Sequence, residues 1–264
     1  MPVAKASNAE ITIVRVEKST IRLSILGTTP LIMNRMSEKA RRELLMPKGR
    51  KTAADKAANL KHVPLEEFRA SPYMLRDTDS PAYLAIMASA FKGAMGTAAL
   101  DLPGARKAQI GRLVYVEGEL VPIYGEPQLF MSVVRSADMN RTPDIRSRVI
   151  IPEWCAEIQV SYVMPTIREQ AVINLLSAAG ITAGVGDWRS EKGKGSYGQF
   201  EVVTATDKRV AQIKKLWGRT KQIEAMAEPR PYDLETEELL SWFTEEAPRR
   251  GFGERNGTKV EVTA

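Results

Sequence analysis

A glycine-rich stretch between a clear helix and a strand is the feature that most limits how this chain can fold. Residues 184–198 read G-V-G-D-W-R-S-E-K-G-K-G-S-Y-G and hold five of the chain's eighteen glycines. Residues 193–198 also match the pattern G-x-G-x-x-G, but that dinucleotide signature needs a strand before it and a helix after it. Here the order is reversed, so we reject a dinucleotide site.

The helix before this stretch is the best marked in the sequence. Thr166 and Glu169 have the spacing of a capping box, and apolar residues recur at helical spacing over 166–179. Gly180 is typical of the position just after a helix, and residues 199–204 read as a strand. We therefore expect a helix, a glycine-rich loop and a strand in that order.

Composition narrows the function classes. The 264 residues carry a net charge of +6 with a pI near 9.4, which favours an acidic partner, nucleic acid first. The single cysteine, Cys155, allows no internal disulfide, and no run is apolar enough for a membrane span or a signal peptide, so we expect a cytoplasmic protein. With one histidine, His62, a His/Cys zinc site or a histidine-based triad is disfavoured. No cofactor is expected.

Three basic segments offer cations to phosphate, over residues 35–61, 135–148 and 184–198. Solvated surface loops would have the same composition, so this interpretation stays open. Trp188 and Tyr197 in the glycine-rich loop have two readings of equal weight: they stack on nucleic-acid bases, or they plug the base of the loop.

Carboxylates in these loops allow a further alternative. Asp138, Asp144 and Asp187 lie near arginines, where they either balance local charge or bind Mg²⁺ for phosphodiester cleavage. No clustered acidic pair singles out a metal site, so local charge balance is the simpler interpretation.

The order of elements predicts the fold. We expect strand 20–26, helix 82–99, strands 148–151 and 157–163, helix 166–179 and strand 199–204. This is the β-α-β-β-α-β order of an α+β, ferredoxin-like or RRM-like core, with an antiparallel sheet and both helices on one face. The domain would span 11–206, with basic and β-rich insertions at about 30–78 and 101–147. A helical extension over 207–246 and a tail over 247–264 would follow.

Finer details are also predicted. A short helix is expected over 37–46, with Ser37 as its N-cap. Glu117-Gly118 should turn a hairpin between 113–116 and 120–123. One helix is expected over 207–227 and a short acidic one over 234–243.

With this order in view, the chain resembles the RAMP superfamily of CRISPR-associated proteins, above all the backbone subunits that polymerise along guide RNA. The glycine-rich loop running into Gln199-Phe200-Glu201-Val202 carries the resemblance, together with Ala90-Phe91-Lys92-Gly93-Ala94 in the first helix and the Arg-rich end of the middle insertion. The extension at 207–246 has no counterpart in that family. A phage or mobile-element protein with the same fold is the alternative.

The resemblance implies that each subunit binds a short stretch of RNA backbone and stacks on the next subunit, without catalysis. Single-stranded DNA is the alternative ligand, and Asp138 would be the first suspect for cleavage. A metal-dependent ribonuclease and an assembly protein without nucleic acid are the alternative functions. The candidate nucleic-acid-binding residues are Arg35, Arg41, Arg42, Lys92, Arg135, Arg141, Arg146, Arg148, Gly184, Gly186, Trp188, Arg189, Lys192, Gly193, Lys194, Gly195 and Tyr197.

Overall fold

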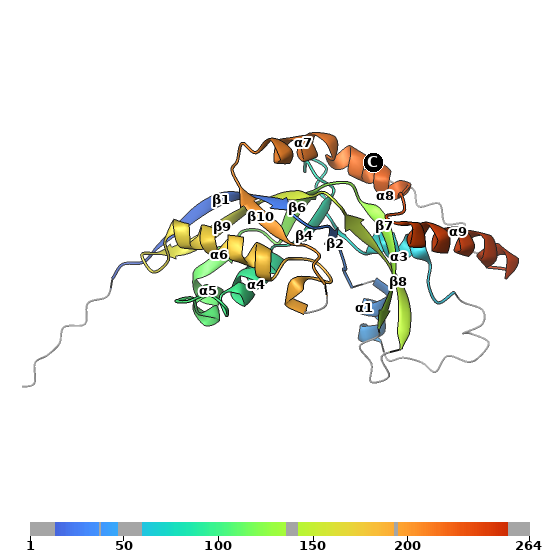
Figure 1. Cartoon of the computed structure of the whole chain (residues 1–264), viewed down its shortest axis with the longest axis horizontal. Helices are drawn as coiled ribbons and strands as arrows, with labels where there is room; N and C mark the ends of the chain where they lie inside the picture. Colours follow the sequence, from blue (N-terminus) through green and yellow to red (C-terminus); the bar gives the residue numbers. More distant parts are fainter. Residues whose placement is uncertain (1–13, 37, 47–59, 136–141, 193–194, 253–264) are drawn as a thin grey trace, which may run out of the picture.

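Two antiparallel sheets organise the chain (Figure 1). The computed structural model describes residues 14–36, 38–46, 60–135, 142–192 and 195–252. The larger sheet runs β10-β1-β9-β6-β4-β3, with β5 also paired to β9, and the smaller runs β2-β8-β7. The strands are β1 Glu17–Gly27, β2 Leu31–Ile32, β3 Tyr73–Met74, β4 Leu84–Met87, β5 Val114–Val116, β6 Leu120–Tyr124, β7 Gln128–Arg135, β8 Pro143–Ile151, β9 Cys155–Met164 and β10 Phe200–Val203.

The helices stand on both faces of the larger sheet and beside the smaller one. They are α1 Glu38–Leu45, α3 Pro64–Ala70, α4 Ala88–Ala98, α5 Lys107–Leu113, α6 Glu169–Thr182, α7 Lys208–Leu216, α8 Arg219–Ala227 and α9 Leu234–Arg249, with a 3-10 turn, η1, at Ser190–Lys192. The predicted short helix is thus present as α1, while Ser37 lies outside the described residues. None of the described helices is long and apolar enough to cross a membrane.

The centre of the larger sheet is the pair β1–β9, which runs from Glu17 opposite Met164 to Leu26 opposite Cys155. Alternate side chains of a strand point to opposite faces. Ile25 therefore joins the main core under α4 and α6, where Phe91 meets Phe200 edge to face with ring centroids 5.7 Å apart. Leu26 joins a second cluster on the other face. Both sheet faces are thus covered.

The predicted α+β ferredoxin-like fold is confirmed, with the core order β10-β1-β9-β6 and with α4 and α6 on one face (Figure 1). The second core strand was assigned wrongly. Residues 148–151 belong to β8, which pairs with β2 and β7, and the core position is filled by β5 and β6. The apolar run at the end of β8 caused this error, because that end is as deeply buried as a strand of the larger sheet.

The predicted start of the first helix and a predicted hairpin after it were also wrong. Helix α4 begins at Ala88, because residues 84–87 pair with β6 as strand β4. The predicted hairpin at Glu117-Gly118 does not form, since β5 and β6 both pair with β9 instead of with each other. Leu84 and Met87 are three residues apart, which is helical spacing, so the apolar periodicity extended the predicted helix into the strand.

The helix before the glycine-rich loop starts and ends later than predicted. Arg168 occupies the N-cap without a side-chain hydrogen bond, so the capping box of Thr166 and Glu169 does not form. Gly180 lies inside the helix rather than after it. A Cβ there would come within 2.0 Å of the Phe200 carbonyl oxygen, so glycine at 180 allows α6 to lie directly on β10.

The C-terminal extension covers the sheet face opposite α4 and α6 (Figure 1). The predicted helix 207–227 is broken at Trp217-Gly218 into α7 and α8. Val210 and Ile213 of α7 pack on Leu26 and Cys155. The fully buried Gln222 of α8 accepts from the Tyr83 amide and donates to the Ile123 and Gly125 carbonyls. This face therefore differs from the open sheet face of an RNA-recognition motif.

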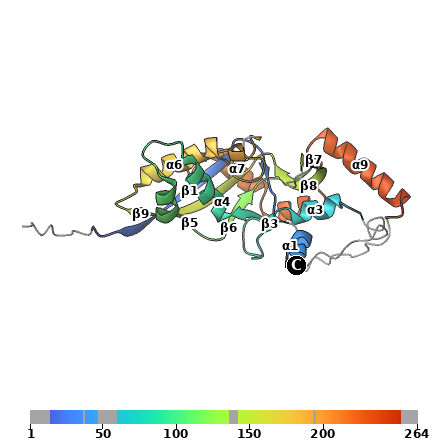
Figure 2. The same ribbon diagram turned by 90° about the horizontal axis from the view of Figure 1, so that it is seen from below.

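Helix α9 lies along the smaller sheet, at the end of the molecule opposite α6 (Figures 1 and 2). Asp233 caps it by accepting from the Thr236 amide, and the Thr236 hydroxyl accepts from the Met131 amide of β7. The helix runs to Arg249, beyond the predicted end at 243, so part of the predicted tail is helical.

Candidate nucleic-acid interface

A groove separates α4 from the glycine-rich loop. Its larger hollow has a volume of about 510 Å³. It is lined by Lys92 and Gly93 on α4, by Lys107 on α5, and by Gly186 and Arg189 of the loop. Three cations and exposed glycine backbone from three separate elements thus face one space.

A second hollow of about 330 Å³ continues this groove past the start of α4. The two hollows share Ser89, Ala90, Gly186 and Arg189 among their lining residues. The second one extends to Asn34 and Tyr73, next to Arg35, whose guanidinium carbon lies 5.3 Å from the centre of the Tyr73 ring. The two adjoining hollows together offer more space than a single small anion would fill.

Two of the three cations of the groove are held in place by neighbours. The Lys92 ammonium lies 4.4 Å from the centre of the Tyr115 ring. Arg189 donates from Nε to Glu191 at 2.7 Å and from Nη1 to the Gly186 carbonyl at 2.9 Å. These contacts orient the cations, although Glu191 offsets part of the charge of Arg189.

Helix α4 presents its N-terminus at the junction of the two hollows. Met87 is its N-cap and provides no side-chain hydrogen bond, while the Ala88 amide donates to the Glu119 carbonyl. Amide groups in the first turn of a helix favour anions. Ser89 and Ala90 of this turn line both hollows, so the helix dipole adds to the charge of the groove's cations.

Arg148 was predicted wrongly as a nucleic-acid contact. It is 2% exposed and forms a close ion pair with Asp187 of the glycine-rich loop, and it donates to the Ser132 hydroxyl at 2.6 Å. Burial lowers the pKa of Arg148, against the opposing effect of the Asp187 carboxylate. The residue therefore fastens β8 to the loop and presents no cation to solvent.

Trp188 and Tyr197 pack at the base of the loop, which favours the second of the two readings that the sequence left open. Their ring centroids lie 6.1 Å apart, Trp188 meets Phe130 edge to face, and Arg148 stacks 4.7 Å above Trp188. Trp188 also has a φ of 50°, an unusual value for a side chain of this size. These contacts tie both aromatic side chains to β7 and β8, and both remain partly exposed.

The other predicted residues fall into separate groups. Arg41 and Arg42 on α1, Arg135 on β7 and Arg146 on β8 are exposed but line neither hollow. Gly184 lines the groove, and a Cβ on Gly195 would meet the Trp188 carbonyl at 1.8 Å. Arg141, Gly193 and Lys194 lie outside the described residues, as does the side chain of Lys192.

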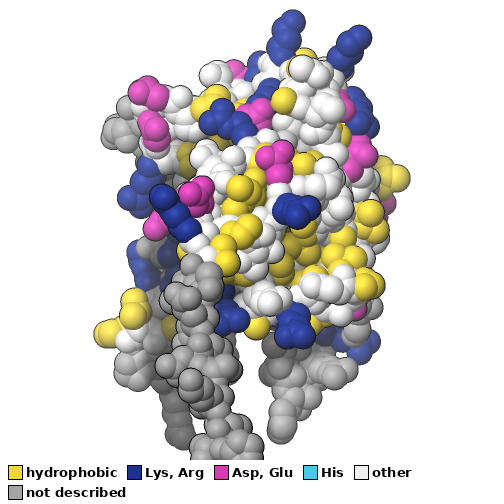
Figure 3. Space-filling view, turned by 90° about the vertical axis from the view of Figure 1, so that its left-hand side faces the viewer, with side chains coloured by type: hydrophobic (Ala, Val, Ile, Leu, Met, Phe, Trp, Pro, Cys, Tyr) yellow, Lys and Arg dark blue, Asp and Glu magenta, His cyan; other side chains and the backbone are white. Residues whose placement is uncertain are grey.

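Sequence reasoning missed several groove residues, among them Asn34, Tyr73, Ser89 and Lys107. Lys107 starts a short helix that carries Ile110 into the core, a weak signal inside a region interpreted as β-structure. The face of the molecule in Figure 3 carries Lys and Arg side chains scattered among hydrophobic ones, so net charge alone points to no single patch.

The described loop aspartates balance charge. Asp144 accepts from Lys61 at 2.5 Å and contacts His62 Nε2 at 2.9 Å, while His62 Nδ1 contacts Glu67 at 2.6 Å. Asp187 accepts from Asn34 as well as from Arg148. Among the residues that the structure describes, no three His, Cys, Asp or Glu side chains gather as metal ligands would. Asp138 lies outside those residues.

No protein-family model matches the chain, and no curated protein matches it. Among solved structures, one match is a chain from a cryo-EM structure of the Type III-B Cmr-beta bound to cognate target RNA. The two chains are 13% identical with a TM-score of 0.34, and the match covers 71% of this chain and 59% of the other, which is less than two thirds of that chain's length. The fold assignment rests on the strand order and helix placement described above.

Proposed function

We propose that this protein binds single-stranded nucleic acid along the groove between α4 and the glycine-rich loop, as one subunit of an oligomer and without cleaving its ligand. One observation carries the proposal: Lys92, Lys107 and Arg189 from three elements line the same hollow. Cations in a row track a phosphate backbone with little regard to sequence.

Two further features support this placement. Glycine backbone and the start of α4 border the groove, which lets phosphate approach main-chain amides. The opposite sheet face is covered by α7 and α8, so bases cannot stack there as they do on an RNA-recognition motif. The helix side of the sheet is the side left for a ligand.

We further propose that the chain is a RAMP-type subunit and that RNA is the preferred strand. The core order β10-β1-β9-β6 and the position of the glycine-rich loop between α6 and β10 agree with the resemblance found in the sequence. A phage or mobile-element relative that coats single-stranded DNA would share both features. Competition between RNA and DNA of identical sequence separates the two, since only RNA carries the 2′-hydroxyl.

A salt-titrated binding assay with a triple variant tests the proposed site. In Lys92→Ala/Lys107→Ala/Arg189→Ala, we expect affinity for single-stranded RNA to fall about tenfold or more. The slope of log affinity against log salt should fall by about 2, since each single-strand phosphate contact contributes roughly 0.7.

The matched control removes three exposed lysines from the other side of the sheet, in Lys208→Ala/Lys215→Ala/Lys221→Ala. It makes the same change in net charge, so it should retain most of the affinity and the slope. Equal losses in the two triple variants would show that only overall charge matters. No binding by the native protein at low salt would contradict the proposal altogether.

The absence of catalysis is tested separately. Native protein incubated with RNA and Mg²⁺ should leave the RNA intact. Cleavage that disappears in Asp144→Ala or Asp138→Ala would favour the ribonuclease alternative.

A further inference from the structure

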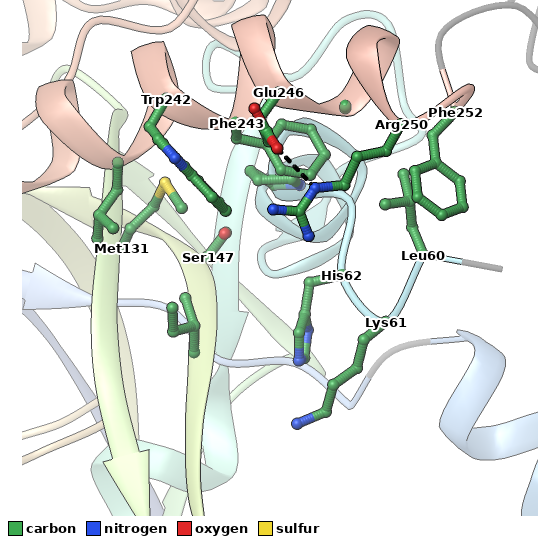
Figure 4. Close-up of a pocket in the computed structure, with 14 residues that line it drawn as sticks. Leu60, Lys61, His62, Met131, Ser147, Trp242, Phe243, Glu246, Arg250 and Phe252 are labelled. Atoms are coloured by element: carbon green, nitrogen blue, oxygen red, sulfur yellow. Dashed lines mark hydrogen bonds and ion pairs between the residues drawn. The ribbon is translucent and has the colours of Figure 1, made fainter. Parts of the chain in front are cut away.

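A second, apolar pocket lies between α9 and the smaller sheet (Figure 4). Its volume is about 240 Å³, and its walls come mainly from hydrophobic side chains. Trp242 and Phe243 of α9 form one wall and Met131 of β7 lies opposite, with Phe252 closing the end. This pocket is at the other end of the molecule from α4 and α6, so it is separate from the groove (Figures 1 and 2).

The polar side chains at the rim of this pocket have hydrogen-bond partners, whereas one buried hydroxyl inside it has none. At the rim, Lys61 and His62 are engaged with Asp144, and Arg250 donates to Glu246 at 2.7 Å. Deeper in, Ser147 is 3% exposed and its hydroxyl has no hydrogen-bond partner. A buried polar atom without a partner is unusual and indicates that something else completes the site.

The pocket's own helix leaves apolar surface in water. Trp242 is 58% exposed although it forms a wall of the pocket. An exposed aromatic beside a hydrophobic hollow is typical of a surface that binds a partner. Because the rim charges are already paired within the chain, the part of the partner that enters must be apolar.

This chain carries an apolar segment of suitable character at the end of α1. Leu44, Leu45 and Met46 are all exposed, with Leu45 82% accessible to solvent. Three consecutive exposed apolar residues at a helix end need a partner to be buried. Met46 adds a sulfur atom, a weak acceptor that suits the unpaired Ser147 hydroxyl.

The charges around the two surfaces are complementary. Helix α9 carries five glutamates and one arginine. Close to the Leu44-Leu45-Met46 end of α1, Arg41 and Arg42 are exposed. Opposite charges around an apolar contact steer two surfaces together and fix their orientation.

We propose that the pocket between α9 and the smaller sheet of one copy receives the Leu44-Leu45-Met46 end of α1 from a second copy. The two surfaces are different patches of the same chain, so the contact is head-to-tail and repeats along a row of subunits. The inference deepens the oligomeric part of the proposed function. It does not use the groove, and it requires no nucleic acid.

Complementary surface variants test this contact in nucleic-acid-free protein by sedimentation velocity over a range of concentrations. The native chain should form a concentration-dependent series of species larger than a dimer. Trp242→Glu blocks the pocket and Leu45→Glu blocks the inserted segment. Both residues are exposed, so folding should be retained, and each variant alone should be monomeric, with association weakened at least tenfold.

A mixture of the two variants gives the sharpest outcome. The intact α1 end of the Trp242→Glu chain still fits the intact pocket of the Leu45→Glu chain, while the other two surfaces are blocked. The mixture should therefore form dimers and stop there. Leu100→Glu, at an exposed leucine elsewhere, is the matched control and should assemble as the native chain does.

Three results would overturn the inference: a native chain that stays monomeric, single variants that assemble normally, or a mixture that stays monomeric. An α1 end seated in the pocket of its own copy would give the first result. The groove triple variant separates this inference from nucleic-acid binding, since it should lose affinity for RNA and still assemble.

Discussion

An arginine lies at each of the two faces of the glycine-rich loop, and the surroundings of the two arginines are opposite: Arg148 is buried and Arg189 lines an open groove. On one face, the buried Arg148 of β8 pairs with Asp187 and packs on Trp188, although Asp187 also lines the second hollow of the groove. On the other, Gly186 and Arg189 line an open groove with Lys92. The difference lies in the burial of the cation: a buried arginine paired with a partly exposed carboxylate fixes the fold, and a cation beside open space and glycine backbone remains able to meet a ligand.

The largest expected effect is on the buried face. Arg148→Ala leaves Asp187 without its main partner, and breaking a buried ion pair costs roughly 3 kcal/mol of unfolding free energy. Urea denaturation measures this loss. Arg148→Met, which fills the same space without the charge, should be less destabilising when combined with Asp187→Asn. An Arg148→Ala protein as stable as the native one would remove the distinction between the two faces.

Gly186→Ala tests how tightly the glycine-rich loop packs against β2, at the point where its two faces meet. Gly186 has a φ of 84°, and a Cβ there would come within 2.6 Å of the Ile32 carbonyl oxygen. We expect a loss of about 2 kcal/mol, because positive φ and overpacking both oppose alanine. Thermal unfolding measures it. Unchanged stability would mean that the loop is not clamped against β2.

The same substitution on the open face should act in the opposite direction on stability. A Cβ on Gly93 meets nothing within 4 Å, and alanine is favoured over glycine in a helix by up to about 1 kcal/mol. Gly93→Ala should therefore stabilise the fold slightly, by thermal unfolding, and weaken RNA binding a few-fold because Gly93 lines the groove. Tighter binding would argue against phosphate at this surface.

We expect a smaller effect on stability at Asp144. Its carboxylate is only partly buried and lies beside Lys61 and His62. Burial raises its pKa, but hydrogen bonds from Lys61 and His62 outweigh this and the net pKa is lowered. A lowered folded-state pKa contributes stability above the unfolded value, near 3.9, that is lost as pH falls through the folded value.

Asp144→Asn should therefore cost less than about 1 kcal/mol at pH 7, since Lys61 is largely exposed and screened. Its stability should also change less than that of the native protein between pH 5 and pH 3. Parallel acid unfolding curves for the two proteins would contradict this assignment.

Local patterns predicted the frame of the fold, but partners far apart in sequence were not predictable. The glycine-rich loop was placed correctly between a helix and a strand because its neighbours have clear periodicity. Strand β8 was assigned to the wrong sheet because burial produces the same apolar run in either sheet. Arg148 was assigned to solvent because the sequence does not show that Asp187 lies beside it.

The candidate site was predicted in outline only. Gly186, Arg189 and Lys92 were each predicted as nucleic-acid contacts, and they line the same groove. Lys107 was missed because its position depends on how α5 folds back beside α4, which only tertiary packing fixes. For Trp188 and Tyr197 the sequence allowed either stacking on bases or packing at the base of the loop. The packing reading is favoured by the contacts of Trp188 with Phe130 and Arg148, which the sequence does not show.

If single-stranded RNA lies in the groove, lysine footprinting should locate it there. Native protein is acetylated with and without bound RNA, and the modification of each lysine is measured by mass spectrometry. We expect RNA to protect Lys92 and Lys107 and to leave the exposed Lys208 and Lys215 of α7 reactive. Protection of the α7 lysines, with Lys92 and Lys107 unchanged, would place the nucleic acid on the other side of the sheet and contradict the account.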